Sequence, residues 1–279
     1  MIIDLEKKLA NFDYKNISVN EIEKLFSREI LGHSRPTIKI STKGLFRARI
    51  ISNVAEKDLE TVKSIWYPDF KEIDEKHHKL NRCSNKGQNF FYSSNSLEAV
   101  IKELEPKDND LIMIGIFHTS NPEIKIRSQY AGIEVLKKIS RKSLQNYLYP
   151  TKNDELIEKY ISSKFQKKIE NDEEYKSSIA FSNILLKNDE INCIIYPSVA
   201  SNLKLINFGI KADFVDDFLF CKSVYIYKVR KTSSQYELLS IKFGKRIYID
   251  QNNTKNSTIY WEENTTLDKQ HITNFNIET

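Results

Sequence analysis

Near the N-terminus, apolar residues recur every three or four positions, which is the spacing of an amphipathic helix. Ser18 and Glu21 form the pattern of a capping box, and Gly32 is placed to end the helix that follows them. The apolar face of this helix consists of Ile22, Leu25, Phe26 and Ile30. We therefore expect residues 1–36 to form a helical appendage, which either packs on the main domain or mediates association of the chain as a homo-oligomer.

From Thr37 onward, apolar and polar residues alternate instead. In the segment 45–51 this alternation predicts a strand, with Arg47 and Arg49 projecting from one face and apolar residues from the other. Two positive charges on one strand face are typical of an anion site. An exposed edge that is kept soluble by charge accounts for the same pattern, so both interpretations stay open.

A polar turn, an aromatic strand and a helix follow one another in residues 81–104. Asn95 and Ser96 are both good N-caps, and Pro106 stops the helix soon afterwards. Glu103 lies beside the apolar stripe of this helix, so we expect its carboxylate at the edge of the core, where its ionisation can be tuned. Ordinary sheet packing also accounts for a strand and helix of this composition.

Later segments alternate between strands and helices. The apolar run 110–117 predicts a buried central strand, and residues 140–187 predict mostly helices. A further apolar strand, 191–197, ends at a proline, which leaves Ser198 at its exit, where loop residues commonly reach a cleft. Because no Gly-x-Ser-x-Gly pattern is present, Ser198 does not indicate a serine hydrolase. More strands are expected between residues 218 and 249.

Charge and composition narrow the class of protein. The 279 residues carry 43 Lys and Arg against 38 Asp and Glu, a net charge of +5, with acidic residues interleaved among the basic ones. This distribution is typical of a solvated lysine-rich surface, so we expect no direct nucleic-acid binding. No apolar run is long enough to span a bilayer, and the start of the chain lacks the order of a secretion signal. The sequence therefore predicts a cytoplasmic protein without membrane contact.

Cysteine and histidine spacing gives no metal pattern. Cys83, Cys193 and Cys221 lie far apart in the sequence, which favours free thiols over disulfides or zinc ligands. His77 and His78 are adjacent and point in different directions, so they are not expected to bind one metal together.

The central segment resembles the motif of the RES-domain family, in which a glycine-containing turn with an arginine precedes a strand ending in tyrosine and a helix ending in glutamate. The matching residues are Arg82, Gly87, Tyr92 and Glu103. Two residues of the family's turn are replaced by Asn81 and Cys83.

Two further segments carry the resemblance beyond the central motif. The aromatic-arginine pair Phe46-Arg47 matches the family's first strand, with Arg49 kept as the alternative arginine. The step from Pro197 to Ser198 matches its third element. The three residues that give the family its name are then present in order.

The resemblance implies an α+β fold of the ADP-ribosyltransferase type, with a two-sheet core, surrounding helices and a cleft that holds NAD. Together with the patterns above, it divides the chain into the helical appendage at 1–36, a catalytic domain at 37–250 and a polar C-terminal tail at 251–279.

Members of this family act as toxins of bacterial toxin-antitoxin or defence systems. The resemblance therefore implies a transferase that cleaves NAD at the nicotinamide–ribose bond, with inorganic phosphate as co-substrate in the NAD phosphorylase reaction, and an antitoxin protein as partner. No metal is implied. Transfer of ADP-ribose to a protein target stays open, as does a non-catalytic binding module that retains the fold.

Residue roles follow from the same resemblance. It implies that Glu103 favours the positively charged ribose of the transition state and that the arginines bind pyrophosphate or phosphate. Tyr92 is expected to stack on nicotinamide and Ser198 to hydrogen-bond a ribose or phosphate oxygen. The implied catalytic residues are Arg47, Glu103 and Ser198, and the implied NAD-binding residues are Arg47, Arg82, Tyr92, Glu103 and Ser198. Glu98 and Glu105 are expected to be solvated surface charges.

Overall fold

The computed structural model describes residues 15–29, 35–41, 44–139, 152–264 and 273–276. The chain forms two compact units, each assembled from three segments. Unit 1 consists of Met1–Ile40, Pro68–Phe90 and Ile126–Val199. Unit 2 consists of Ser41–Tyr67, Phe91–Lys125 and Ala200–Thr279. The division predicted from the sequence follows chain order, whereas these units interleave along the chain.

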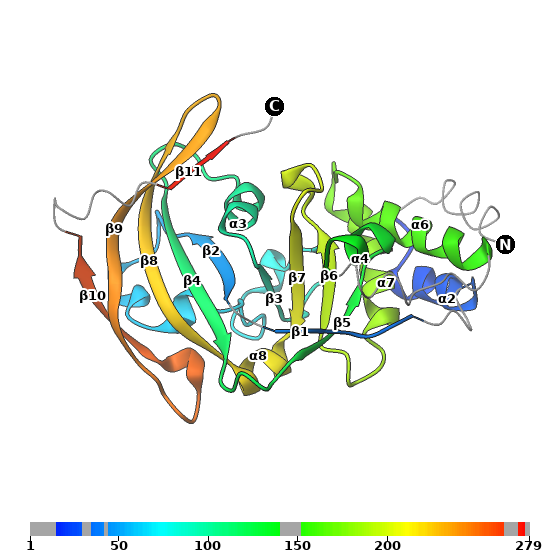
Figure 1. The fold of residues 1–279 in the computed structure, drawn as a ribbon, viewed down its shortest axis with the longest axis horizontal. Coiled ribbons are helices and arrows are strands. Elements are labelled where there is room, and N and C mark those ends of the chain that lie inside the picture. Colours follow the sequence, from blue (N-terminus) through cyan, green and yellow to red (C-terminus); the bar gives the residue numbers. More distant parts are fainter. Residues whose placement is uncertain (1–14, 30–34, 42–43, 140–151, 265–272, 277–279) are drawn as a thin grey trace. The chain divides into compact units, whose positions relative to one another are not determined.

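Unit 2 is built on a sheet whose strands are neighbours in the order β7, β3, β2, β4, β8, β9 and β10, with β11 also paired to β9. Their bounds are β2 Leu45–Ile50, β3 Phe90–Ser94, β4 Leu111–Thr119, β7 Ile206–Lys211, β8 Leu219–Lys231, β9 Gln235–Tyr248, β10 Thr258–Glu263 and β11 Thr273–Asn276. Strands β2, β4, β8 and β9 run side by side and antiparallel (Figure 1). The expected polar tail at 251–279 thus contributes two strands to unit 2.

Strand β4 is the buried central strand that the apolar run 110–117 predicts, since β2 flanks it on one side and β8 on the other. The faces of β2 are also as predicted. Phe46 and Ala48 pack against an apolar cluster on the side of helix α3 (Leu97–Leu104). The cluster consists of Ile101, Ile112, Ile114, Val229, Tyr236 and Leu238. Arg47 and Arg49 therefore project from the opposite face of β2.

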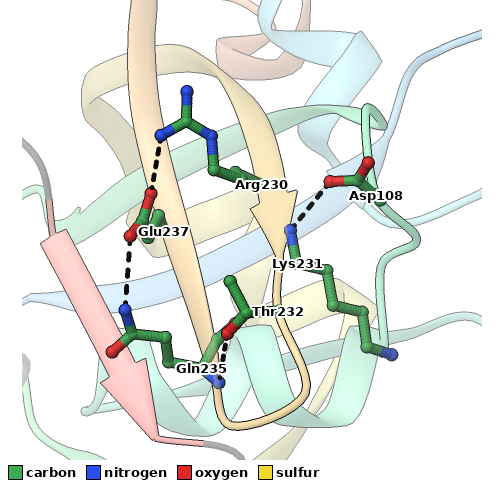
Figure 2. A network of polar contacts seen from close by, with 6 residues as sticks. All are labelled: Asp108, Arg230, Lys231, Thr232, Gln235 and Glu237. Atoms are coloured by element: carbon green, nitrogen blue, oxygen red, sulfur yellow. Dashed lines mark hydrogen bonds and ion pairs between the residues drawn. The ribbon is translucent and has the colours of Figure 1, made fainter.

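Polar contacts close the hairpin between β8 and β9 (Figure 2). The backbone amide of Lys231 donates to Asp108 Oδ1 at 2.9 Å, which ties the hairpin to the loop before β4. Across the strands, Arg230 Nη1 donates to Glu237 Oε2 at 3.2 Å, and within β9 Gln235 Nε2 donates to Glu237 Oε1 at 3.2 Å. The first of these two bonds joins residues that are paired across the hairpin.

Unit 1 combines three strands with helices. Strand β1 (Ile38–Ile40) is antiparallel to β5 (Ile126–Tyr130), and β5 is parallel to β6 (Cys193–Pro197). Its α-helices are α2 Val19–Glu29, α4 Ile133–Ile139, α6 Lys152–Gln166 and α7 Lys176–Leu185. Helices α6 and α7 confirm the helices predicted within 140–187, of which residues 140–151 lie outside the described part.

The predicted N-terminal helix is α2, and its predicted capping box is confirmed. The backbone amide of Ser18 donates to Glu21 Oε2 at 2.8 Å, and the amide of Glu21 donates to Ser18 Oγ at 3.2 Å. The bonds that the Ser18 amide and hydroxyl donate to the Glu21 carboxylate lower the pKa of Glu21. Helix α2 lies against α7 within unit 1 (Figure 1), where the rings of Phe26 and Phe181 stack with centroids 4.0 Å apart.

Short elements complete both units. In unit 2, helix α8 (Ala212–Phe218) links β7 to β8. The 3₁₀ helices are η1 Glu56–Leu59, η2 Val62–Ile65, η3 Glu75–His77, η4 Asp172–Tyr175, η5 Val199–Ser201 and η6 Thr254–Asn256. Both units thus mix helices with strands, and the strand pairs of unit 2 are mainly antiparallel, which agrees with the predicted α+β class at the level of secondary structure. Among the residues that the structure describes, no helix has the length and apolarity needed to cross a membrane.

The packing of α2 on α7 predicts that Phe26→Ala destabilises the protein strongly. Phe26 is fully buried, so removal of its ring leaves a cavity and should lower the free energy of unfolding by about 3–5 kcal/mol. Leu156→Ala, at a position of unit 1 that is 44% exposed, is the control and should change the free energy by less than about 0.5 kcal/mol. Urea denaturation measures both. Equal stability of the two variants would mean that α2 does not pack on α7.

Candidate active site

Three of the five predicted site residues belong to unit 2. Arg47 lies on β2, Tyr92 on β3 and Glu103 on α3, so they come from elements that are neighbours in the fold. Arg82 and Ser198 belong to unit 1 and are described with that unit.

The turn from β3 into α3 is closed by hydrogen bonds of two serine hydroxyl groups, of Ser94 and Ser96. Ser94 is fully buried, and its Oγ donates to the carbonyl oxygen of Ile206 on β7 at 2.6 Å. The same Oγ accepts a hydrogen bond from the amide of Ser96 at 3.1 Å. Of the two predicted N-caps, Ser96 is the one used, since its Oγ accepts from the amide of Ala99 at 3.3 Å.

Helix α3 ends at Leu104, one residue after Glu103. Glu105 takes the left-handed conformation at the C-cap, with φ of 46°, and its amide donates to the carbonyl oxygen of Ile101. A non-glycine residue in this conformation is uncommon, and Pro106 then prevents the helix from continuing. The C-terminal end of α3 is therefore fixed at Leu104, directly after Glu103.

Arg47 is half-buried and oriented by two backbone oxygens. Its Nε donates to the carbonyl oxygen of Ile65 at 3.0 Å, and its Nη1 donates to the carbonyl oxygen of Tyr92 at 2.9 Å. Its Cζ lies 5.3 Å from the centre of the Phe91 ring. The guanidinium group thus joins η2 to β3, so its planar fork is held in one orientation.

This position lies where two strands diverge. Strand β2 pairs with β4 along its whole length, whereas it pairs with β3 at Phe46, opposite Ser94. Beyond that pair, the Arg47 guanidinium takes the place of direct strand pairing by binding the Tyr92 carbonyl.

Arg49 differs from Arg47 in exposure and reach. It is exposed, and its Nη1 donates to the carbonyl oxygen of Ser64 at 2.9 Å. Both arginines therefore bind η2, which confirms that they share one face of β2. Arg47 also reaches β3.

Segment η2 is itself held by a carboxylate that the sequence pattern did not single out. Trp66 Nε1 donates to Asp216 Oδ1 at 2.9 Å, and the Tyr67 hydroxyl donates to Asp216 Oδ2 at 2.5 Å. Both rings are buried. Because Trp66 directly follows η2, the hydrogen bonds to Asp216 on α8 help to fix the carbonyl oxygens that orient Arg47 and Arg49.

The Glu103 carboxylate is exposed and has a buried partner. Its Oε1 accepts a hydrogen bond from Asn207 Nδ2 at 2.8 Å, and Asn207 is 4% exposed on β7. The carboxylate thus lies between solvent and the interior, at the edge position that the helical pattern predicts. Sequence reasoning missed Asn207. The available signal was a polar residue inside the apolar strand 206–210, since a buried amide needs a partner.

Glu98 was predicted to be a solvated surface charge, and its side chain is 39% exposed. Its Oε1 also lies 2.9 Å from Lys102 Nζ, and the Lys102 side chain is only 5% exposed. A buried ammonium group needs an opposite charge, so Glu98 has a structural role. Glu105 is exposed, as predicted.

In unit 1, Arg82 is bound to the end of a helix. Its Nη1 donates to the carbonyl oxygens of Phe165 at 3.1 Å and Lys167 at 3.2 Å, and its Cζ lies 5.3 Å from the centre of the Tyr175 ring. These oxygens belong to the C-terminal end of α6, where an arginine compensates for carbonyl groups without intrahelical partners. Ser198 directly follows β6, as predicted, and is fully buried.

The three cysteines are buried free thiols, which confirms the prediction against disulfides. Burial raises the pKa of Cys83 and of Cys221 to about 12 and also raises the pKa of Cys193. Because the thiolate is the nucleophilic form, none of these cysteines supplies a nucleophile at neutral pH. Within the described ranges of the chain, no three His, Cys, Asp or Glu side chains group as metal ligands.

No protein-family model matches this chain, and no curated protein matches it. Of the residues on which the expected resemblance to the RES-domain family rests, Arg47, Tyr92 and Glu103 lie in unit 2.

The two arginines should differ in what they contribute to stability. A lysine at position 47 lacks the rigid planar fork that spans both carbonyl oxygens, so Arg47→Lys should lower the free energy of unfolding by about 1–3 kcal/mol. Arg49→Lys, at an exposed position, is the matched control and should change it by less than about 0.5 kcal/mol. Guanidinium chloride denaturation measures both variants, and the reverse ranking would assign the anchoring role to Arg49.

Proposed function

We propose that this protein is an enzyme that cleaves NAD at the nicotinamide–ribose bond, with inorganic phosphate as the acceptor. The observation that carries the proposal is the Glu103 carboxylate, which is exposed to solvent yet oriented at 2.8 Å by a buried amide on a neighbouring strand. A substrate that approaches Glu103 from solvent therefore meets a negative charge in a fixed orientation.

The chemistry of NAD cleavage suits such a group. When the bond between nicotinamide and ribose C1 breaks, positive charge develops on the ribose, as in glycoside hydrolysis. A carboxylate placed beside that ring stabilises the transition state more than the ground state. Nicotinamide leaves with the bonding electrons, and a phosphate oxygen then bonds to C1, which gives nicotinamide and ADP-ribose 1″-phosphate.

Arg47 and Tyr92 supply the neighbouring groups. The guanidinium carries a full positive charge and is held by two backbone oxygens, so we assign it to the pyrophosphate of NAD or to the incoming phosphate. Tyr92, whose carbonyl holds Arg47, offers a half-buried ring that we assign to the nicotinamide.

The assignments of Arg82 to phosphate and of Ser198 to a ribose or phosphate oxygen rest on the RES-family resemblance. So do two broader parts of the proposal: the two-sheet fold of the ADP-ribosyltransferase type, and a toxin role with an antitoxin as partner. The proposed cytoplasmic location rests on the sequence pattern instead. The mixed helix and strand content of both units agrees with the α+β class, which is the coarser part of the expected fold.

The Glu103→Gln variant tests the proposal. Glutamine keeps the size and an acceptor oxygen for Asn207 but removes the charge, so stability should change little. NAD turnover should fall by about 10²-fold to 10⁴-fold, the range for loss of a positioned acid-base or electrostatic group. The measurement follows NAD loss and its products by liquid chromatography and mass spectrometry, with and without phosphate.

Glu105→Gln is the matched control, because it removes an exposed carboxylate two residues away and should leave turnover within about threefold of the wild type. Among the products, ADP-ribose 1″-phosphate supports phosphorolysis, and free ADP-ribose or labelled protein indicates hydrolysis or transfer. Wild-type protein that leaves NAD intact, or a Glu103→Gln protein with full activity, would overturn the proposal.

A further inference from the structure

Asn207 is a buried residue whose side-chain amide binds the carboxylate of an exposed residue. It lies on β7 before three further buried residues, 208–210, is 4% exposed, and donates from Nδ2 to Glu103 Oε1 at 2.8 Å. The carboxylate on the other side of this bond is exposed. A hydrogen bond from a packed strand to an exposed side chain restricts the exposed partner, because the buried one has little freedom to move.

A second hydrogen bond links α3 to the same part of β7. Ser94, just before the helix, donates to the carbonyl oxygen of Ile206 at 2.6 Å, and Ser94 is fully buried. Ile206 and Asn207 are consecutive, so one short piece of β7 contacts the chain before the first turn of α3 and also its last turn. The backbone of the helix and the carboxylate on it are thus aligned to one strand.

We infer that Asn207 is a positioning residue that orients the Glu103 carboxylate toward the substrate, a role that rests on the proposed function. A glutamate side chain has several rotatable bonds, and an exposed one samples many rotamers. The bond from Asn207 Nδ2 to Oε1 selects rotamers that keep the carboxylate beside β7. Such selection matters for turnover, because a misplacement of about 1 Å can cost about 10²-fold in rate.

A purely structural role for this pair makes a different prediction. If the bond serves only to satisfy the buried amide of Asn207, any acceptor at position 103 suffices, and the loss of Asn207 should affect stability rather than catalysis. If Asn207 orients a catalytic charge, its loss should lower kcat only while Glu103 is present. The two roles therefore separate in a double-mutant cycle.

The test compares Asn207→Leu with the wild type in the Glu103 and in the Glu103→Gln background. Leucine has a similar size and lacks the donor. We expect Asn207→Leu to lower kcat for NAD by about 10-fold to 100-fold with KM changed less than about threefold, and to cause no further loss in the Glu103→Gln background. Equal losses in both backgrounds, or an unchanged kcat, would overturn the positioning role.

Asn183→Leu is the matched control. Asn183 Nδ2 donates to Glu23 Oε2 at 3.2 Å in unit 1, so it forms the same kind of amide–carboxylate bond without any role in the proposed reaction. This variant should leave kcat within about twofold of the wild type. A loss of kcat as large as that of Asn207→Leu would attribute the effect to a general loss of packing.

A spectroscopic measurement keeps the inference testable if Asn207→Leu fails to fold or if the wild type does not consume NAD. In folded Glu103→Gln protein, the side-chain amide resonance of Asn207 in a ¹⁵N spectrum should shift, while that of Asn183 should stay in place. Inactive wild-type protein with a shifted Asn207 resonance overturns the proposed function but supports the orientation of Glu103. An Asn207 resonance that does not respond overturns the inferred contact itself.

Discussion

The candidate site in unit 2 depends on the two hydrogen bonds of the Ser94 hydroxyl group. This hydroxyl is fully buried and uses both of its capacities, as a donor to Ile206 on β7 and as an acceptor from the amide that opens α3. Burial of a hydroxyl without partners costs free energy, so these bonds hold β3, α3 and β7 in fixed positions relative to one another. Glu103 lies on α3 and is therefore positioned by the same bonds, and Asn207 links its carboxylate directly to β7.

The arginine side of the site rests on a second set of polar contacts. Asp216 binds the side chains of Trp66 and Tyr67, which directly follow η2. Carbonyl oxygens of η2 in turn orient Arg47 and Arg49. A half-buried guanidinium and an exposed carboxylate are thus both held in unit 2 by contacts to residues distant in sequence, which is the kind of preorganisation that favours catalysis by fixed charges.

Features that depend on local spacing could be predicted from the sequence. Alternation in the segment 45–51 gave the correct faces of β2, and the serine at position 96 opens α3, because both signals act within a few residues. The pair of Glu98 with Lys102 is also local, at i and i+4, and could have been predicted from the charge spacing.

The remaining features depend on contacts between residues far apart in the sequence. The bond between Asn207 and Glu103 spans 104 positions, and that between Trp66 and Asp216 spans 150. The partners of Arg82 are also distant in sequence, since they are carbonyl oxygens at the end of α6, more than 80 residues later. Strands β10 and β11 arise in a polar segment because they pair with β9. No local pattern encodes such pairings.

A crystal structure of the Glu103→Gln protein with NAD would test most directly whether α3 presents residue 103 to the substrate. The substitution should slow cleavage while it preserves the acceptor for Asn207, so intact NAD can be observed. We expect the ribose that carries nicotinamide within hydrogen-bond reach, about 2.6–3.2 Å, of the side chain at position 103. NAD bound with that ribose away from α3, or no bound NAD at saturating concentration, would contradict the proposed role of Glu103.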